Sequence, residues 1–346
     1  MTNTAGKYCF THRTGEDIFL FSLRNSAGTE ITITNYGAII SSFKIQMDDG
    51  TNNDIVLGFD NIEDYLADDY LNKYPFFGAA IGRYANRIKN AAFEIDGKKY
   101  PLTSNSRNNQ LHGGHEGFDK KVWQWVAQGE TPHHWLELKY TSPDGEEGYP
   151  GKLAVTIRFE LTNDNELSYA YTASCDKATA VNLTHHGYFN LNRGSGTIED
   201  HEVKIYASSV LEQDEGLVAT GQLTPVKNTG YDFTEFTAVG NGSIPAEDFD
   251  KSFVLDPRKD CLVAEARSLR SGLRLQVYST EPVVHFYTGK WIPVIKGKNG
   301  NTYGPLSGLC LETQKHPNAV NIPGFANTVL RSGETYSHKT TYKIII

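Results

Sequence analysis

Residues 152–173, KLAVTIRFELTNDNELSYAYTA, decide the fold of this chain. Large apolar residues recur at every second position over 152–161 and again over 166–173, and the turn-forming run TNDN separates the two runs. A period of two is typical of a β-strand that buries one face and exposes the other. The stretch therefore predicts a β-hairpin with one solvated face.

Further strand pairs follow the same logic. Residues 93–100 turn on the Asp-Gly pair at 96–97, a favoured two-residue hairpin loop, and residues 262–266 and 273–278 flank a Ser-Gly turn at 271–272. The tail 335–346 alternates less cleanly and ends in three isoleucines, which predicts a strand buried on both faces. Helical signal is confined to residues 61–70, with Asn61 as the expected N-cap.

No linker, composition break or internal repeat divides the 346 residues, and 32 glycines and 13 prolines fit a chain with many turns. All-β folds often extend over this length as one unit. We therefore expect an all-β protein, folded as one large antiparallel β-sandwich domain over residues 1–346.

The composition excludes several classes of partner. The net charge is -8 and no basic stripe is present, so a nucleic acid partner is not expected. No apolar run approaches membrane-spanning length, and the first residues lack a hydrophobic signal segment. The four cysteines show no CxxC spacing and fit reduced thiols. We expect a cytoplasmic protein without membrane contact.

Residues 309–314, LCLETQ, place an ionisable group in an apolar strand. Period two puts Cys310, Glu312 and Gln314 on one face, so that face meets either a cleft or water. A solvated edge strand is the ordinary alternative. A carboxylate base on a rigid strand is the functional interpretation, because a buried carboxylate without a partner is costly.

Residues 182–191, NLTHHGYFNL, place two histidines in a similar run. Neighbouring strand residues point to opposite faces, so only one of His185 and His186 can share a cleft with Glu312. Tyr188 and Asn190 lie on the face of His186 and would give a polar, aromatic surface suited to a sugar. An imidazole and a carboxylate can protonate one sugar oxygen while deprotonating another. The alternative to a catalytic role is a structural histidine whose hydrogen bonds are made within the fold.

A glycine-rich loop, LHGGHEGF at 111–118, carries His112 where a ligand can approach the backbone. His112 and His115 have the spacing of two metal ligands, but no third ligand or cysteine pair supports a metal site. We expect no metal and no cofactor.

Two further segments offer partners for hydroxyl groups. Asn86 and Arg87, in IGRYANRI at 81–88, would present a fork of donors, although surface salt bridges are the usual fate of arginine. Asp250 could accept hydrogen bonds from two vicinal hydroxyls, or could lie in a solvated loop.

In their order along the chain these segments resemble the aldose 1-epimerase family, which includes the galactose mutarotases. The matching segments cover nearly the whole chain: 81–88, 111–114 with 117–119, 182–191, 249–250, 277–280 with 286–289, and 311–314 with 317–321. The resemblance implies the mutarotase-like β-sandwich, known as a supersandwich.

The resemblance also implies roles. The family's proton acceptor falls on Glu312, its proton donor on His186 and its sugar-positioning histidine on His112. Substrate binding falls on Asn86, Arg87, Tyr188 and Asp250, with His285 where a glutamine often contacts the sugar. His185 also departs from the pattern, since asparagine commonly precedes the donor.

The implied reaction interconverts the α- and β-anomers of an aldohexose, most often galactose and also glucose. The partner is then a monosaccharide, and the protein is a monomer or a homodimer.

Three alternatives remain open on sequence grounds. They are a glycoside hydrolase using Asp250 and Glu312, a hexose-6-phosphate epimerase, for which no cationic cluster beyond Arg83 and Arg87 is seen, and a sugar-binding protein without activity.

Overall fold

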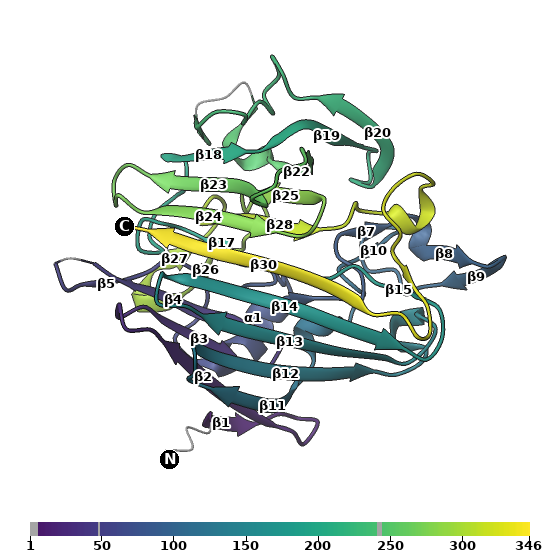
Figure 1. Cartoon of the computed structure of the whole chain (residues 1–346), viewed down its shortest axis with the longest axis horizontal. Coiled ribbons are helices and arrows are strands. Elements are labelled where there is room, and N and C mark those ends of the chain that lie inside the picture. Colours follow the sequence, from purple (N-terminus) through teal and green to yellow (C-terminus); the bar gives the residue numbers. More distant parts are fainter. Residues whose placement is uncertain (1–5, 48, 241–243) are drawn as a thin grey trace.

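The computed structural model describes residues 6–47, 49–240 and 244–346. Antiparallel strands dominate it, and two large sheets pack face to face, which confirms the all-β sandwich (Figure 1). The long strands of the larger sheet run side by side across the front of Figure 1, and the hairpin β8–β9 projects at the edge.

The larger sheet has nine strands, and the hairpin predicted from residues 152–173 lies within it as β13 and β14. Its strands, in spatial order, are β11 (Gln124–Gly129), β12 (His134–Ser142), β13 (Leu153–Leu161), β14 (Glu166–Cys175), β30 (Tyr336–Ile345), β24 (Arg274–Ser279), β23 (Leu262–Ser268), β18 (His201–Ile205) and β21 (Thr237–Ala238). β13 and β14 pair in unbroken register from Leu153 opposite Cys175 to Leu161 opposite Leu167. The large apolar residues of both strands are buried, as the alternation requires.

The second sheet has six strands and carries four of the candidate site residues, Tyr188, Asp250, His285 and Glu312. Its order is β17 (Tyr188–Phe189), β28 (Leu309–Gln314), β25 (Val283–Tyr287), β22 (Asp250–Leu255), β19 (Ala207–Gln213) and β20 (Ala219–Pro225). Thr313 on β28 meets Tyr169 on β14, and Phe189 on β17 packs edge-on against Tyr342 on β30. The face with Leu309, Leu311 and Thr313 therefore packs on the larger sheet, and the face with Glu312 looks away from it.

A five-stranded sheet at the N-terminal end and several short strand pairs complete the structure. The five strands are β1 (Lys7–Thr11), β2 (Asp17–Arg24), β3 (Glu30–Thr34), β4 (Ile40–Gln46) and β5 (Asn52–Asp54). The pairs are β6 (Ala80–Ile81) with β16 (Thr184–His185), β7 (Arg87–Ile88) with β10 (Gln110–Leu111), β8 (Ala92–Ile95) with β9 (Lys98–Pro101), β15 (Thr179–Ala180) with β29 (Val329–Leu330), and β26 (Ile295–Lys296) with β27 (Thr302–Tyr303).

The helical prediction for residues 61–70 is wrong in detail. The segment forms a 3-10 helix, η1 (Ile62–Leu66), followed by one α-helical turn, α1 (Asp68–Leu71), and the Asn61 side chain makes no capping bond. Single 3-10 turns occur at η2 (Lys89–Ala91), η3 (Phe118–Lys120), η4 (Glu146–Gly148), η5 (Ala246–Asp248), η6 (Lys298–Gly300) and η7 (Ala319–Asn321). Within the described parts of the chain, no helix has the length and hydrophobicity needed to cross a bilayer.

The C-terminal strand is also corrected. β30 alternates between buried and accessible residues, with Tyr336 and His338 buried and Ser337 and Lys339 exposed, so only one of its faces is buried.

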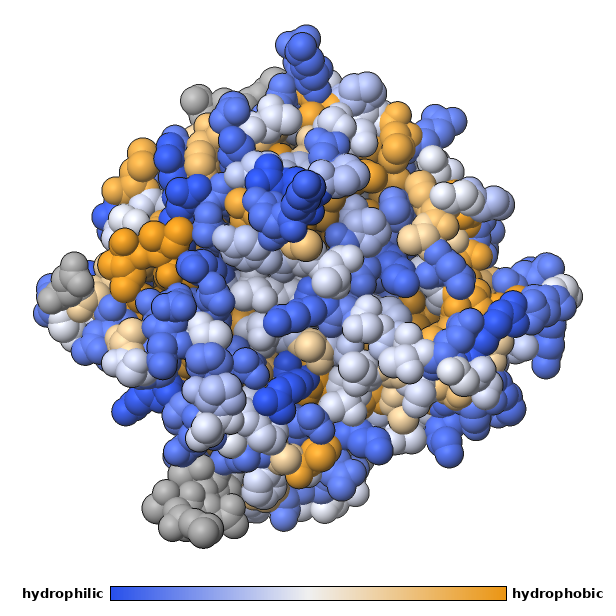
Figure 2. Space-filling model, viewed as in Figure 1, coloured by the Kyte–Doolittle hydropathy of each residue, from blue (hydrophilic) through white to orange (hydrophobic). Residues whose placement is uncertain are grey.

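On the face of the molecule shown in Figure 2, hydrophobic residues lie in small separate groups among hydrophilic ones.

Candidate active site

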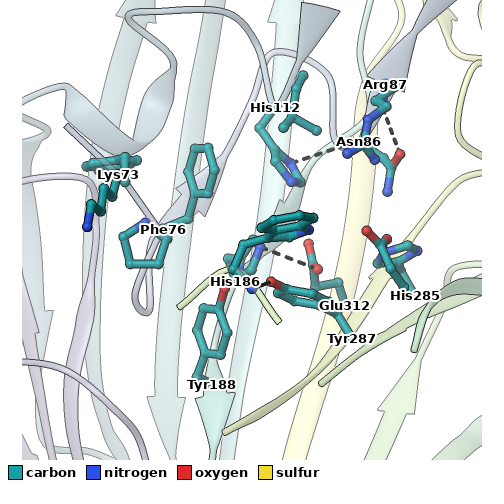
Figure 3. A pocket seen from close by; sticks show the side chains of 15 residues that line it. Lys73, Phe76, Asn86, Arg87, His112, His186, Tyr188, His285, Tyr287 and Glu312 are labelled. Carbon is teal, nitrogen blue, oxygen red and sulfur yellow. Dashed lines mark hydrogen bonds and ion pairs between the residues drawn. The ribbon is translucent and has the colours of Figure 1, made fainter. Parts of the chain in front are cut away.

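A pocket of about 190 Å³ opens beside the six-stranded sheet (Figure 3). This volume is below the roughly 300–1,000 Å³ of pockets for drug-sized ligands and suits a single small ring. The residues that line it are Lys73, Tyr74, Pro75, Phe76, Asn86, Arg87, Leu111, His112, His186, Tyr188, Asp250, His285, Tyr287, Trp291 and Glu312. The eight residues to which the resemblance assigns catalytic or sugar-binding roles are all among them.

Glu312 projects into this pocket from β28, an inner strand between β17 and β25. The residue is 1% exposed, so the solvated-edge interpretation is wrong. Burial raises the pKa of the Glu312 carboxyl well above its ordinary value; the charge of Asp250 adds to this and the charge of Arg87 opposes it. One carboxyl oxygen, Oε2, has no hydrogen-bond partner within the described residues, so it is free to meet a ligand.

The two neighbouring histidines point to opposite sides, as the strand geometry predicts. His185 lies in the core against the rings of Phe159 and Tyr169, and its Nε2 is 3.3 Å from the carbonyl oxygen of Ala38. His186 lines the pocket, and its Nε2 is 3.6 Å from Oε1 of Glu312 (Figure 3). His186 is thus the histidine that faces Glu312.

Aromatic rings enclose His186 on both faces. Tyr188 and Phe76 stack on the imidazole with centroid distances of 4.9 and 5.5 Å. Burial lowers the pKa of His186 to about 3, and the neighbouring His285 adds to the effect. Burial therefore disfavours the charged form of both members of the pair in the free protein.

His112 is fixed by the backbone of the segment that carries Asn86. The amide N–H of Asn86 donates to Nδ1 of His112 at 3.2 Å, which leaves the ring hydrogen on Nε2. Burial lowers the pKa of His112 well below its ordinary value, and the charges of His186 and Arg87 lower it further. The neutral ring therefore acts as a hydrogen-bond donor through Nε2.

The loop after His112 needs glycine at one position. Gly113 has φ +87°, and a Cβ there would lie 1.9 Å from the carbonyl oxygen of Gly82. This close approach joins the His112 loop to the segment that leads into Asn86 and Arg87.

Asn86 and Arg87 stand at the start of β7. The backbone N–H of Arg87 donates to Oδ1 of Asn86 at 2.8 Å, which fixes the Asn86 side chain against the backbone of its neighbour. Nε of Arg87 is buried without a partner within the described residues. Burial lowers the pKa of Arg87, and Asp250 opposes that shift. A guanidinium with unused donors at a pocket wall is suited to hydroxyl oxygens.

Asp250 and His285 form a connected pair on adjacent strands. Nε2 of His285 lies 2.8 Å from Oδ1 of Asp250, and Nδ1 of His285 lies 2.8 Å from the hydroxyl of Ser252. Burial alone would raise the pKa of Asp250, but the hydrogen bond from His285 and the charges of His285 and Arg87 hold it below its ordinary value. The solvated-loop interpretation of Asp250 is wrong, because its side chain is only 20% exposed.

Other residues have roles that the sequence did not reveal. Phe76 contacts both His112 and His186 from a loop, with its backbone at φ +62°. Trp291 is 67% exposed and lines the pocket. Tyr287 lies two residues beyond His285 on β25, so period two could have found it. Asn190, expected near the sugar, instead binds backbone carbonyls away from the pocket.

Ligand atoms of His112, His186 and Glu312 lie within 4.8 Å of one another, close enough to consider a metal. The hydrogen bond from Asn86 to Nδ1 makes Nε2 of His112 a donor, whereas a metal would need its lone pair. His115 is exposed, and its Nε2 meets the carbonyl oxygen of Ser104. The donor set therefore fits a hydroxylated ligand better than a metal ion.

An all-β sandwich whose small pocket joins a carboxyl group, an imidazole and several hydroxyl-binding side chains belongs to the class of carbohydrate enzymes that act by proton transfer. A family model described as aldose 1-epimerase matches residues 20–343. This chain belongs to the aldose 1-epimerase family.

Individual relatives agree with this membership. The chain is 42% identical over 324 residues to the galactose mutarotase of Homo sapiens, covering 91% of each chain. It is 35% identical over 341 residues to the aldose 1-epimerase of Escherichia coli K12, covering 96% of each.

Solved structures confirm the fold. An aldose epimerase homologue from C. elegans superposes with a TM-score of 0.87 at 28% identity, covering 95% of this chain and 99% of that one. The galactose 1-epimerase of Lactobacillus acidophilus gives 0.84 at 26% identity, covering 99% of each.

Proposed function

We propose that this protein interconverts the α- and β-anomers of aldohexoses, D-galactose and D-glucose, by acid–base catalysis without a cofactor or metal. The observation that carries the proposal is the approach of His186 Nε2 to Glu312 Oε1 at 3.6 Å inside a pocket of about 190 Å³. An acid and a base on one small ring are what ring opening requires.

The reaction consists of two balanced proton transfers. Ionised Glu312 takes the proton of the anomeric hydroxyl while protonated His186 gives its Nε2 proton to the ring oxygen, and the C1–O5 bond breaks. The open sugar has a carbonyl at C1 and a hydroxyl at C5. Rotation about C1–C2 exposes the other carbonyl face. Closure then returns one proton to Nε2 and transfers the other from Glu312 to the new anomeric oxygen.

The pair reaches this reactive state by internal proton transfer. When the pair holds one proton in the free enzyme, burial favours that proton on Glu312, because it disfavours both the carboxylate and the imidazolium. Moving that proton to His186 gives the carboxylate and imidazolium that the sugar needs, with no change in the total number of protons. The sugar's polar groups replace some of the solvation that both charges lack in the empty pocket.

The remaining pocket residues hold the sugar. Asn86, Arg87 and Nε2 of His112 donate hydrogen bonds, whereas Oδ2 of Asp250 can accept them. Retaining the open aldehyde by these contacts keeps it in reach of the pair until the ring closes. Tyr188 packs behind His186 and limits the movement of the imidazole.

The cellular setting belongs to the same proposal. We expect a cytoplasmic enzyme that works as a monomer or homodimer on a free monosaccharide. The four free cysteines are typical of a protein in the reducing cytoplasm. The net charge of -8 gives no reason to expect a nucleic acid partner.

Optical rotation of freshly dissolved α-D-galactose and α-D-glucose tests the proposal. The protein should accelerate the approach to the equilibrium rotation of both sugars. Methyl α-D-galactoside is the matched control, since it has no free anomeric hydroxyl and its rotation should stay constant. Release of methanol from that control would instead indicate a glycoside hydrolase that uses Asp250 and Glu312.

A further inference from the structure

Strand β28 contacts both ring nitrogens of His186. The sulfur of Cys310 lies 3.5 Å from Nδ1, and Oε1 of Glu312 lies 3.6 Å from Nε2. Cys310 and Glu312 are two residues apart and therefore project from the same face of the strand. The proton transfers described above use Glu312 but assign nothing to Cys310.

The distances to the neighbouring groups indicate which nitrogen carries the ring hydrogen. The 3.5 Å from Nδ1 to the sulfur of Cys310 is within hydrogen-bond distance for sulfur, whereas the 3.6 Å from Nε2 to Oε1 of Glu312 is longer than a hydrogen bond. The hydrogen of the neutral ring then belongs on Nδ1. Burial raises the pKa of Cys310 well above its ordinary value, so the partner of Nδ1 is a neutral sulfur.

A second contact leaves that sulfur available as an acceptor. The hydroxyl of Tyr188, which is the partner of Cys310 across the β17–β28 pair, lowers the pKa of the thiol as an O–H donor to the sulfur would. The sulfur has two lone pairs, so it can accept from Tyr188 and also receive the Nδ1 hydrogen. Figure 3 shows Tyr188 beside His186, on the side of the pocket away from Arg87.

We propose that Cys310 is a positioning residue whose sulfur accepts the Nδ1 hydrogen of His186 in both protonation states of the ring. Nε2 is then the one ring nitrogen that exchanges a proton with the sugar. The inference rests on the proposed function, because it explains how His186 can act as acid and base through one atom.

This arrangement has two chemical consequences. After His186 gives its Nε2 proton to the ring oxygen, the imidazole is already the Nδ1–H tautomer and can take the proton back without rearranging. A carboxylate at Nδ1 would orient the ring equally well but would also favour the imidazolium. A neutral sulfur orients the ring and keeps the imidazolium a strong acid.

Long-range proton–nitrogen NMR spectra of histidine-labelled protein test the inference directly. The resonances of His186 are assigned by their loss in His186→Asn. We expect the neutral ring of the wild-type protein to be the Nδ1–H tautomer. A neutral ring with its hydrogen on Nε2 would overturn the inference, whatever any Cys310 variant does.

Two variants and a matched control extend the test. Cys310→Ala should return His186 towards the Nε2–H tautomer and lower kcat by about tenfold with KM little changed, because an acid or base must be held in place to act. Cys310→Ser keeps an acceptor and should keep the Nδ1–H tautomer, with kcat within about threefold of wild type. Cys175→Ala removes a half-buried thiol outside the pocket, whose hydrogen bond goes to the carbonyl oxygen of Leu330. This control should change neither the tautomer of His186 nor kcat.

The outcomes separate this inference from the proposed function. An unchanged tautomer and unchanged kcat in Cys310→Ala would overturn the role of Cys310 even if the wild-type enzyme is an active mutarotase. A wild-type protein with the Nδ1–H tautomer but without mutarotation would overturn the proposed function and leave the hydrogen-bond assignment in place.

Discussion

His186 is enclosed by aromatic rings, and this burial lowers its affinity for a proton. Stacking between Phe76 and Tyr188 removes water from both faces of the imidazole. The same loss of water acts on Glu312 with the opposite sign, because burial penalises whichever form is charged. The pair therefore binds and releases protons as a unit.

The pH dependence of kcat/KM should be a bell with a broad plateau. The active form of the pair has one proton, so activity is lost at low pH when His186 gains a second and at high pH when Glu312 loses the last. Burial lowers the first pKa below the ordinary histidine value of 6.5 and raises the second above the ordinary glutamate value of 4.5. An acid limb centred at the ordinary histidine value, measured polarimetrically with galactose, would contradict this assignment.

Replacing the two neighbouring histidines should separate activity from stability. His186→Asn removes the group that faces Glu312 and should lower kcat by about 100-fold or more with little loss of stability. His185→Asn places a polar amide against Phe159 and Tyr169 in the core, so it should lower the melting temperature and leave kcat of the folded enzyme near wild type. The reverse pattern would mean that His185 supplies the proton.

The sequence identified residues whose chemistry is unusual for their surroundings. Glu312 and His186 could be found because burying an ionisable group in an apolar strand costs free energy, so such a group indicates a functional role. Phe76 could not be found in this way, since an aromatic residue in a loop carries no sign of where the loop lies. Its contacts with His112 and His186 arise from tertiary packing alone.

Among the structural elements, the six-stranded sheet carries Glu312, Asp250 and His285. His186 lies between β16 and β17, and His112 lies in the loop after β10. β28 and β25 place Glu312 and His285 directly opposite each other, with period two fixing their shared face. Two hydrogen bonds join the segment before β7 to the His112 loop: the His112 amide donates to the carbonyl oxygen of Asn86, and the Asn86 amide donates to Nδ1 of His112. Precise placement of several groups on rigid strands explains why small changes in this framework should affect catalysis.

Arg83 anchors the segment that leads to Asn86 and Arg87, and it is not the surface salt-bridge former that its type suggests. The guanidinium is buried and donates to Ser142, Pro143 and Pro150. Arg83→Met should leave these acceptors unsatisfied and lower the free energy of unfolding by roughly 2–4 kcal/mol, measured by denaturant titration.

A surface arginine provides the matched control for that measurement. Arg331 forms an ion pair with Asp96 whose side chains are 50% and 63% exposed. Arg331→Met should therefore cost less than about 1 kcal/mol. Equal losses in the two variants would show that Arg83 contributes no more than a surface charge.

Periodicity predicted strands well where one face is buried, and it failed where burial depends on distant neighbours. Residues 152–173 formed the hairpin expected of them, because alternation reports directly on one buried face. The tail 335–346 ends in apolar residues, yet Ile345 and Ile346 are 37% and 52% exposed at the end of β30. The helical signal of 61–70 is short, and the segment forms η1 and α1 with the extended residue Ala67 between them. Tyr65 and Tyr70 are buried in an aromatic cluster with Phe59 and Phe77, a set of long-range contacts that the local pattern does not report.

For the whole molecule, we infer that residues 1–346 form one domain. A single cluster of buried apolar side chains extends from Phe21 on β2 to Ile344 on β30 and includes residues of both large sheets. Thermal unfolding should therefore be one cooperative transition, with equal calorimetric and van't Hoff enthalpies. Two separate transitions, or a fragment that melts independently, would contradict a single domain.

We propose that Glu312 and His186 together open and close the sugar ring. Polarimetry of freshly dissolved α-D-galactose, with wild type and Glu312→Gln compared in a buffer containing EDTA, is the decisive measurement for this pair. We expect rapid mutarotation by the wild type and a loss of at least about 100-fold in kcat for Glu312→Gln, which keeps the shape of the side chain but removes the base. Thermal melting of the variant establishes that it is folded. Near-normal rates in folded Glu312→Gln, or wild-type activity that EDTA abolishes and zinc restores, would contradict the account.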